Sequence, residues 1–151
     1  LIQKNISISC AESCTGGLFA STLLKVPGMS AVFDRGFVTY SNQSKIEELG
    51  VSPNTIETHG AVSPETAKEM SEGVYRASGS HVCIAITGIA GPDGGTSEKP
   101  VGLAYISVEH TDQNHQHHHI ISRFIAAQNK SREDIQKIFV LKMLAEINRI
   151  I

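Results

Sequence analysis

Residues 12–17 combine a serine and a threonine with two glycines, a set of side chains suited to acyl-transfer chemistry. The preceding residues 6–10 alternate apolar and polar, which predicts a half-buried strand. The following residues 18–26 contain no Gly or Pro and predict a helix. Backbone N–H groups and the helix dipole favour negative charge where a strand leads into a helix. Ser13 could therefore act as a nucleophile beside an oxyanion site, or the turn could bind a phosphate. The local pattern alone favours a simpler role, in which Ser13 or Thr15 caps the helix.

A serine nucleophile needs a base, and Lys45 is the candidate that the sequence offers. A strand over residues 32–40 and a helix over 43–49 place this lysine one turn into a helix that begins at a strand end. The histidines are not placed for a Ser-His-Asp relay, because His59 and His81 lie outside the strand-end loops and the others cluster further on. A lysine with a lowered pKa is the usual substitute. The alternative is a solvated helix lysine, which the residue type alone favours.

Two further segments carry groups that could bind a ligand. The glycine-rich loop 88–95 follows a predicted buried strand at 81–87 and would let a ligand approach its N–H groups, although it matches neither the dinucleotide fingerprint nor the P-loop spacing. A tight surface loop is the alternative. A metal could bind weakly at the histidine cluster, but a solvated hairpin tip is favoured, because a structural site needs ligands from a second segment. The clustered residues are His115, His117, His118 and His119.

The expected elements alternate between strands and helices. Besides those named above, the periodicity predicts helices near 64–78 and 132–150 and strands at 101–108 and 120–125. This order predicts an α/β domain whose mixed sheet is covered by helices on both faces. Binding sites in such sheets form outside the strand ends, where the turns after the first, second and third strands would meet.

The composition excludes several classes of protein. With 40% apolar residues and a formal charge of −2, the 151 residues predict one globular domain spanning 1–151. Lys and Arg are scattered along the sequence and do not form the basic cluster that is typical of nucleic-acid-binding proteins. No apolar run approaches the roughly 18 residues of a membrane span. Three cysteines indicate reduced thiols in the cytoplasm rather than a disulfide framework. One of them, Cys14, is an alternative nucleophile that ranks below Ser13.

Five blocks, in order and spread over nearly the whole chain, resemble the signature of the CinA C-terminal domain family. They are AESCTGG at 11–17, RGFVTYSN at 35–42, HGAVS at 59–63, TGIAGPDGG at 87–95 and KPVG at 99–102. That family includes the bacterial nicotinamide mononucleotide deamidases. The resemblance implies a three-layer α/β/α sandwich. It also implies hydrolysis of the nicotinamide carboxamide to nicotinate mononucleotide and ammonia, in pyridine nucleotide recycling.

The resemblance further implies roles for individual residues. Ser13 is the nucleophile, Lys45 its general base, and Tyr40 a polar partner that orients the pair or relays the proton. Backbone N–H groups near Ser13 would hold the oxyanion, and no metal or cofactor is needed. Arg132 would hold the phosphate. The full set of implied substrate-binding residues is Glu12, Cys14, Thr15, Gly16, Thr87, Gly88, Ile89, Ala90, Gly91 and Arg132.

The chain departs from the family pattern in two places. Family members carry a Gly-x-Arg or Gly-Asn-Arg turn before the last helix, where this chain reads Lys130-Ser131-Arg132, and the stretch from Phe124 is longer than usual. The family's N-terminal helix is absent or reduced to residues 1–5.

The expected partners are a small-molecule substrate, nicotinamide mononucleotide, and further copies of the chain in a homo-oligomer. Two other functions remain open: a non-catalytic nucleotide-binding or interaction module of a competence- or damage-inducible protein, and the same chemistry on another amide.

Overall fold

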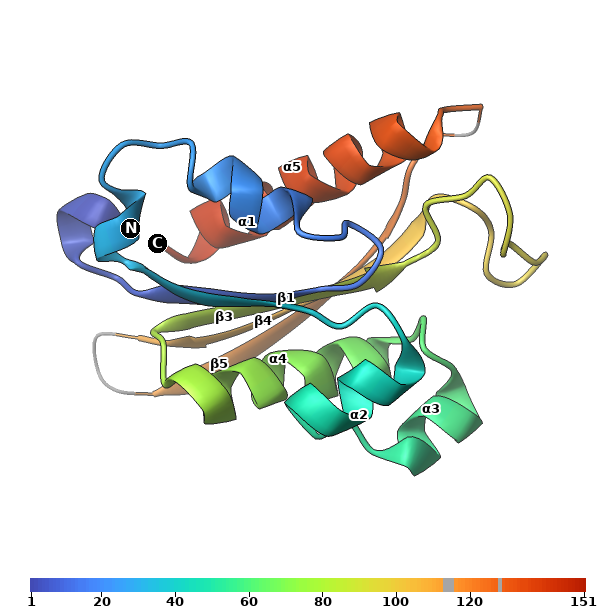
Figure 1. The fold of residues 1–151 in the computed structure, drawn as a ribbon, viewed down its shortest axis with the longest axis horizontal. Helices are drawn as coiled ribbons and strands as arrows, with labels where there is room; N and C mark the ends of the chain where they lie inside the picture. The colour runs from blue at the N-terminus through green and yellow to red at the C-terminus, as the bar shows by residue number, and fades with distance from the viewer. Residues whose placement is uncertain (113–115, 128) are drawn as a thin grey trace.

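The strands of this computed structural model, which describes residues 1–112, 116–127 and 129–151, form one mixed sheet in the order β2-β1-β3-β4-β5 (Figure 1). β1, β2 and β3 run parallel, whereas β4 and β5 are antiparallel to their neighbours. The bounds are β1 (Ile8–Glu12), β2 (Phe33–Val38), β3 (Val82–Gly88), β4 (Leu103–Thr111) and β5 (His117–Ile125).

Helices cover both faces of this sheet (Figure 1). One face carries α1 (Leu18–Leu23) and α5 (Arg132–Ile150), and the other carries α2 (Asn42–Leu49), α3 (Pro53–His59) and α4 (Pro64–Ser78), while short 3-10 turns lie at Ile2–Lys4 and Met29–Ala31. The expected α/β/α sandwich with a mixed sheet is confirmed. No helix in the described ranges is long and apolar enough to cross a membrane.

Two apolar clusters hold the layers together. On the α1 and α5 face, Phe19, Phe139 and Met143 pack without exposure against the sheet. On the other face, Leu49 from α2 and Met70 from α4 pack against the sheet. Burying each such side chain contributes on the order of 1.5–3 kcal/mol. α2 is thereby fixed close to the sheet, which matters because it carries Lys45.

The first strand differs from its prediction. β1 begins at Ile8 and is buried along its whole length, because it lies between β2 and β3 with helices over both faces. The expectation of a half-buried strand is therefore wrong. One of its buried polar side chains, Ser9, is satisfied by a hydrogen bond of 2.8 Å with the Ser80 hydroxyl. β1 ends at Glu12, so Ser13 leaves the sheet at the carboxyl end of a rigid central strand.

The histidine cluster also differs from its prediction. His117, His118 and His119 lie in the edge strand β5, paired with β4, and not in a hairpin tip. His115 lies outside the described residues. Histidine has a weak strand preference, and the pairing partners in β4 override it. In contrast, the helix over 64–78 is confirmed to the residue, with the Ser63 hydroxyl accepting from the Thr66 N–H as its cap.

Candidate active site

A hollow of about 260 Å³ opens at the carboxyl ends of β1 and β3, where an α/β sheet is expected to bind its ligand. This volume is at the small end for a small-molecule site. Most of the predicted site residues line it, whereas Glu12, Thr15 and Gly16 do not. The lining residues are Ser13, Cys14, Tyr40, Lys45, Ala61, Val62, Thr87, Gly88, Ile89, Ala90, Gly91, Asp93, Gly94 and Arg132.

Ser13 and Lys45 meet at the floor of the hollow. The Ser13 hydroxyl lies 3.0 Å from the Lys45 Nζ, and the two side chains come from segments 32 residues apart. Ser13 is fixed by its own N–H, which donates to the Ile86 carbonyl in β3. The exposed fraction is 7% for Ser13 and 1% for Lys45, so the contact is shielded from bulk water while remaining at the edge of the hollow.

Lys45 is buried without a counter-ion. In the described ranges no carboxylate forms an ion pair with it; the lysine ion pairs there belong to Lys68 and Lys137. Its Nζ instead lies 2.7 Å from the Thr39 carbonyl and 3.2 Å from that of Tyr40. Burial lowers the pKa of Lys45 from 10.5 to about 8. A third carbonyl, that of Ser41, lies 3.4 Å from the same nitrogen. A neutral amine can donate its two hydrogens to two of these three carbonyls and keep its lone pair for the Ser13 hydroxyl.

Local sequence explains why Lys45 points inward. α2 begins after Ser41, whose hydroxyl accepts from the Ser44 N–H, and ends at Gly50, which adopts the left-handed conformation that suits glycine. Leu49, one turn after Lys45 and 2% exposed, anchors the same side of the helix in the core. The lysine is therefore carried inward by the packing of its own helix.

The turn after β1 is organised by Glu12 and not by a serine or threonine cap. The N-cap of α1 is Gly17, without a side-chain cap of its own. The Glu12 carboxylate, 1% exposed, accepts from the N–H groups of Gly17, Phe19 and Ala20 at 2.9–3.1 Å. The expectation that Ser13 or Thr15 caps this helix is wrong. The carboxylate already satisfies the helix N-terminus, so α1 offers little to an anion in the hollow.

Main-chain N–H groups next to Ser13 remain as candidate oxyanion donors. The Gly16 N–H is used by the Ser13 carbonyl at 3.2 Å. Within the described ranges, the N–H groups of Cys14 and Thr15 donate to no other residue's oxygen. The N–H groups of Cys14 and Thr15 are therefore the candidate donors, and of these two residues Cys14 lines the hollow.

Tyr40 and Arg132 form the rim of the hollow. The Tyr40 hydroxyl accepts from the Arg132 guanidinium at 3.0 Å, and the same guanidinium donates to the Gly91 carbonyl at 2.5 Å. The Tyr40 side chain is 62% exposed, and in this arrangement its hydroxyl contacts Arg132 and not the Ser13–Lys45 pair. Its main-chain carbonyl, however, is one of the lysine's acceptors. Arg132 begins α5, so the rim joins β2, the glycine-rich loop and α5.

The remaining wall comes from two loops that a hydrogen bond ties together. The Thr87 hydroxyl donates to the Ala61 carbonyl at 2.7 Å, which holds residues 61 and 62 against the hollow. Gly88 permits close packing, because a Cβ there would lie 2.7 Å from the Leu103 carbonyl oxygen. Ala61 and Val62 were not predicted as site residues; their only sequence signal is the block at 59–63. Asp93 and Gly94 were expected only as part of the glycine-rich loop.

Two other candidate groups differ from the Ser13–Lys45 pair. Burial raises the pKa of the Cys14 thiol to about 12, which keeps it protonated at neutral pH and weak as a nucleophile. Among residues 1–112, 116–127 and 129–151, no three His, Cys, Asp or Glu side chains are grouped so as to hold a metal ion.

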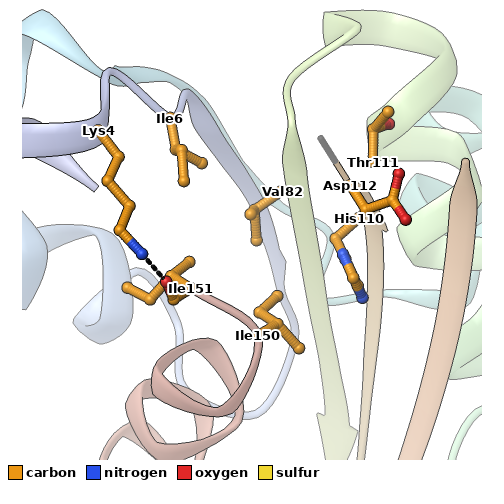
Figure 2. A pocket seen from close by; sticks show the side chains of 8 residues that line it. All are labelled: Lys4, Ile6, Val82, His110, Thr111, Asp112, Ile150 and Ile151. Atoms are coloured by element: carbon orange, nitrogen blue, oxygen red, sulfur yellow. Dashed lines mark hydrogen bonds between the residues drawn. The ribbon is translucent and has the colours of Figure 1, made fainter. Parts of the chain in front are cut away.

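A larger hollow of about 350 Å³ lies at the opposite end of β3, beside the two chain ends (Figure 2). Figure 2 shows the Lys4 ammonium donating to the Ile151 carbonyl, with Ile6, Val82 and Ile150 forming the apolar wall. Lys4 is exposed, unlike Lys45, and it contacts no hydroxyl nucleophile among the described residues. Size therefore does not select the candidate site; the chemistry of the lining does.

Comparisons with known sequences identify relatives of this chain. A putative competence-damage inducible protein of Acetivibrio thermocellus is 58% identical over 111 residues, which are 74% of this chain and 27% of that protein. The corresponding Clostridium kluyveri protein is 56% identical over 108 residues, 72% of this chain and 26% of its own length. The chain thus spans a minor part of the length of these relatives.

Solved structures extend the likeness to nearly the whole chain. The competence/damage inducible protein CihA from Agrobacterium tumefaciens superposes with a TM-score of 0.90 at 40% identity, covering 99% of this chain and 87% of that one. A CinA superfamily protein from Klebsiella pneumoniae gives a TM-score of 0.89 at 31% identity, covering 99% of this chain and 89% of that one. The CinA C-terminal domain pattern matches residues 1–151 in full. This chain therefore belongs to the CinA C-terminal domain family.

Proposed function

We propose that this protein is an amidohydrolase that removes the carboxamide nitrogen of nicotinamide mononucleotide, giving nicotinate mononucleotide and ammonia. The observation that carries this proposal is the 3.0 Å contact between the Ser13 hydroxyl and the buried Lys45 amine, which has no carboxylate partner in the described ranges. A hydroxyl beside a lysine of lowered pKa is an arrangement that activates a serine for acyl transfer.

The first chemical step is proton transfer from Ser13 to neutral Lys45. The Ser13 oxygen then attacks the carboxamide carbon, and negative charge develops on the amide oxygen. The N–H of Cys14, a residue that lines the hollow, is the candidate donor for that charge, with the N–H of Thr15 next to it.

The second half of the reaction reverses the proton's path. Protonated Lys45 gives its proton to the amide nitrogen, the C–N bond breaks, and ammonia leaves an ester on Ser13. Water then attacks this ester, with Lys45 accepting its proton. Lys45 returns that proton to the Ser13 oxygen as the bond between serine and the acyl group breaks, and the carboxylate product is released. Each step needs the lysine to change protonation state, which a pKa of about 8 permits near neutral pH.

The rim supports a substrate that carries an anion. Arg132 is the cationic side chain at the mouth of the hollow, and its guanidinium matches the geometry of a phosphate. Asp93 lines the same hollow and is suited to the positive pyridinium ring or to the ribose hydroxyls.

An ammonia-release assay tests this function. Wild-type protein is incubated with nicotinamide mononucleotide, nicotinamide riboside and nicotinamide, beside Ser13→Ala as the matched control. We expect release from the mononucleotide above all, and its loss in Ser13→Ala with an unchanged melting temperature. Full activity in Ser13→Ala would remove the nucleophile assignment, and release from a different amide would redirect the proposed substrate.

A second candidate is favoured by the names of the relatives, which refer to competence and damage induction. On that reading the hollow binds a nucleotide without turning it over. Calorimetry then detects binding of the mononucleotide in wild type and in Ser13→Ala alike, with no ammonia from either.

A further inference from the structure

Gln136, on α5, reaches the turn that carries Ser13 from the far end of the sequence. Its Nε2 donates to the Cys14 carbonyl at 2.8 Å, across 122 residues of chain. The half-buried side chain lies one turn after Arg132 on the same helix, so the two share one side of α5. Phe139 and Met143, both fully buried, fix the orientation of this helix. The turn is therefore held from outside by a rigid element.

The hydrogen bond fixes one particular peptide plane. The Cys14–Thr15 peptide is trans, so its carbonyl and its N–H point in opposite directions. With the Cys14 carbonyl held toward α5, the Thr15 N–H is aimed away from α5. It is one of the two N–H groups that donate to no other residue's oxygen within the described ranges.

We propose that Gln136 is a positioning residue of the Ser13 site, which holds the main chain at Cys14, and with it the N–H donors beside Ser13, in the orientation that acyl transfer needs. This inference rests on the proposed acyl transfer at Ser13 but not on the identity of the amide. Glu12 complements it by holding the other end of the turn through Gly17 and α1. Neither side chain lines the hollow, and both act through the main chain.

A serine-directed phosphonofluoridate tests the inference without any amide substrate. A bond forms between the Ser13 oxygen and phosphorus, the P–F bond breaks, fluoride leaves, and the serine proton passes to Lys45. The phosphoryl oxygen gains negative charge in this step and needs the same N–H donors as the amide oxygen. The labelling rate therefore reports the donor geometry directly.

Gln136→Leu keeps the size of the side chain and removes the donor. We expect labelling and kcat for the amide to fall about 10- to 100-fold with little change in KM, because a donor that stabilises only the transition state is misaimed. Lys137→Leu, the next residue on the same helix with an exposed side chain, is the control and should label at the wild-type rate. Ser13→Ala should not label.

Gln136→Glu separates positioning from packing. An ionised carboxylate repels the Cys14 carbonyl, whereas a protonated carboxyl can donate to it. The labelling rate of this variant relative to wild type should therefore rise as the pH falls from 8 toward 5. A ratio that does not change with pH, or a wild-type rate in Gln136→Leu, would overturn the inference. Labelling that depends on Gln136 without any ammonia release would support it and overturn the proposed amide hydrolysis. An unlabelled wild type would overturn the nucleophile and this inference together.

Discussion

Ser13 and Ser107 each contact a base, and of these two serines Ser13 is the one that opens on a hollow. Ser13 lies 3.0 Å from Lys45, and Ser107 lies 2.5 Å from the Nε2 of His119. Burial lowers the pKa of both bases. A serine beside a histidine is the more familiar pair in hydrolases, yet Ser107 is wholly buried in β4 and lines none of the hollows described above.

The number of polar partners separates the two pairs. The Ser107 hydroxyl contacts the Ser71 hydroxyl at 2.8 Å as well as the His119 Nε2, so it belongs to a buried chain of polar groups. The Ser13 hydroxyl has the Lys45 Nζ as its side-chain partner among the described residues. The hydroxyl of Ser13 is therefore not shared with a second side chain there, whereas that of Ser107 is.

The largest expected effect is the loss of the base at Ser13. Lys45→Met keeps an unbranched side chain but cannot accept a proton, so kcat for ammonia release should fall about 10³-fold. Steady-state kinetics measure the change, with Lys68→Met as a control that removes an exposed lysine. A variant that keeps a tenth of wild-type activity would show that Lys45 is not the base.

The same lysine should make stability depend on pH. The pKa of Lys45 is about 8 in the folded protein and 10.5 when exposed, so the unfolded chain binds this proton more tightly between those values. The contribution of Lys45 to stability should therefore rise by about 3 kcal/mol from pH 8 to pH 10.5, and its penalty is fully present below pH 8. The buried thiols, whose pKa values are raised, act in the opposite direction and do so in both proteins compared below. Denaturant unfolding of wild type and Lys45→Met isolates the effect. Parallel pH curves for the two proteins would contradict it.

The Ser13–Lys45 pair also differs from the Ser107–His119 pair in access to a ligand, because it opens on a hollow that has Arg132 at its rim. Arg132→Leu should lower kcat/KM for the mononucleotide about 10- to 100-fold, as expected for loss of a charge-assisted hydrogen bond to phosphate. Nicotinamide riboside, which has no phosphate, is the matched substrate control. An equal loss for both substrates would mean that Arg132 does not bind the phosphate and instead supports the rim through its hydrogen bonds to Tyr40 and Gly91.

The smallest effect should come from the other serine. Ser107→Ala removes one link of a buried hydroxyl chain and should cost about 1 kcal/mol of stability while leaving activity unchanged. Thermal unfolding and the ammonia assay measure the two quantities on the same sample. If Ser107→Ala lost activity without losing stability, the catalytic role would belong to Ser107 and the assignment of Ser13 as the nucleophile would be wrong.

Much of the fold was predictable because its signals are local. The Ser-Pro-Glu start and the apolar spacing that predict α4 both lie within or next to the helix's own 15 residues. Similar local patterns predict the order of the strands and helices. The burial of β1 on both faces was not predictable, because it depends on which strands flank it. The extension of β5 through three histidines likewise depends on its partners in β4.

The site shows the same limit more sharply. Residue type favours a solvated Lys45, and only the packing of Leu49 and the sheet buries it. A capping rule that looks for Ser or Thr overlooks Glu12, whose carboxylate reaches over five residues of chain to α1. Gln136 has no local signal at all, since its partner is 122 residues away. The resemblance to the family supplied the pairing of Ser13 with Lys45 that local patterns lack.

The pH dependence of Ser13 phosphonylation tests the central claim most directly, because it reads the lysine through its partner without requiring the correct amide. The labelling rate of wild-type protein should rise with pH to a plateau with a midpoint near 8, and Lys45→Met should label slowly at every pH. A midpoint near 10.5, or the same profile in Lys45→Met, would contradict the assignment of Lys45 as the base that activates Ser13.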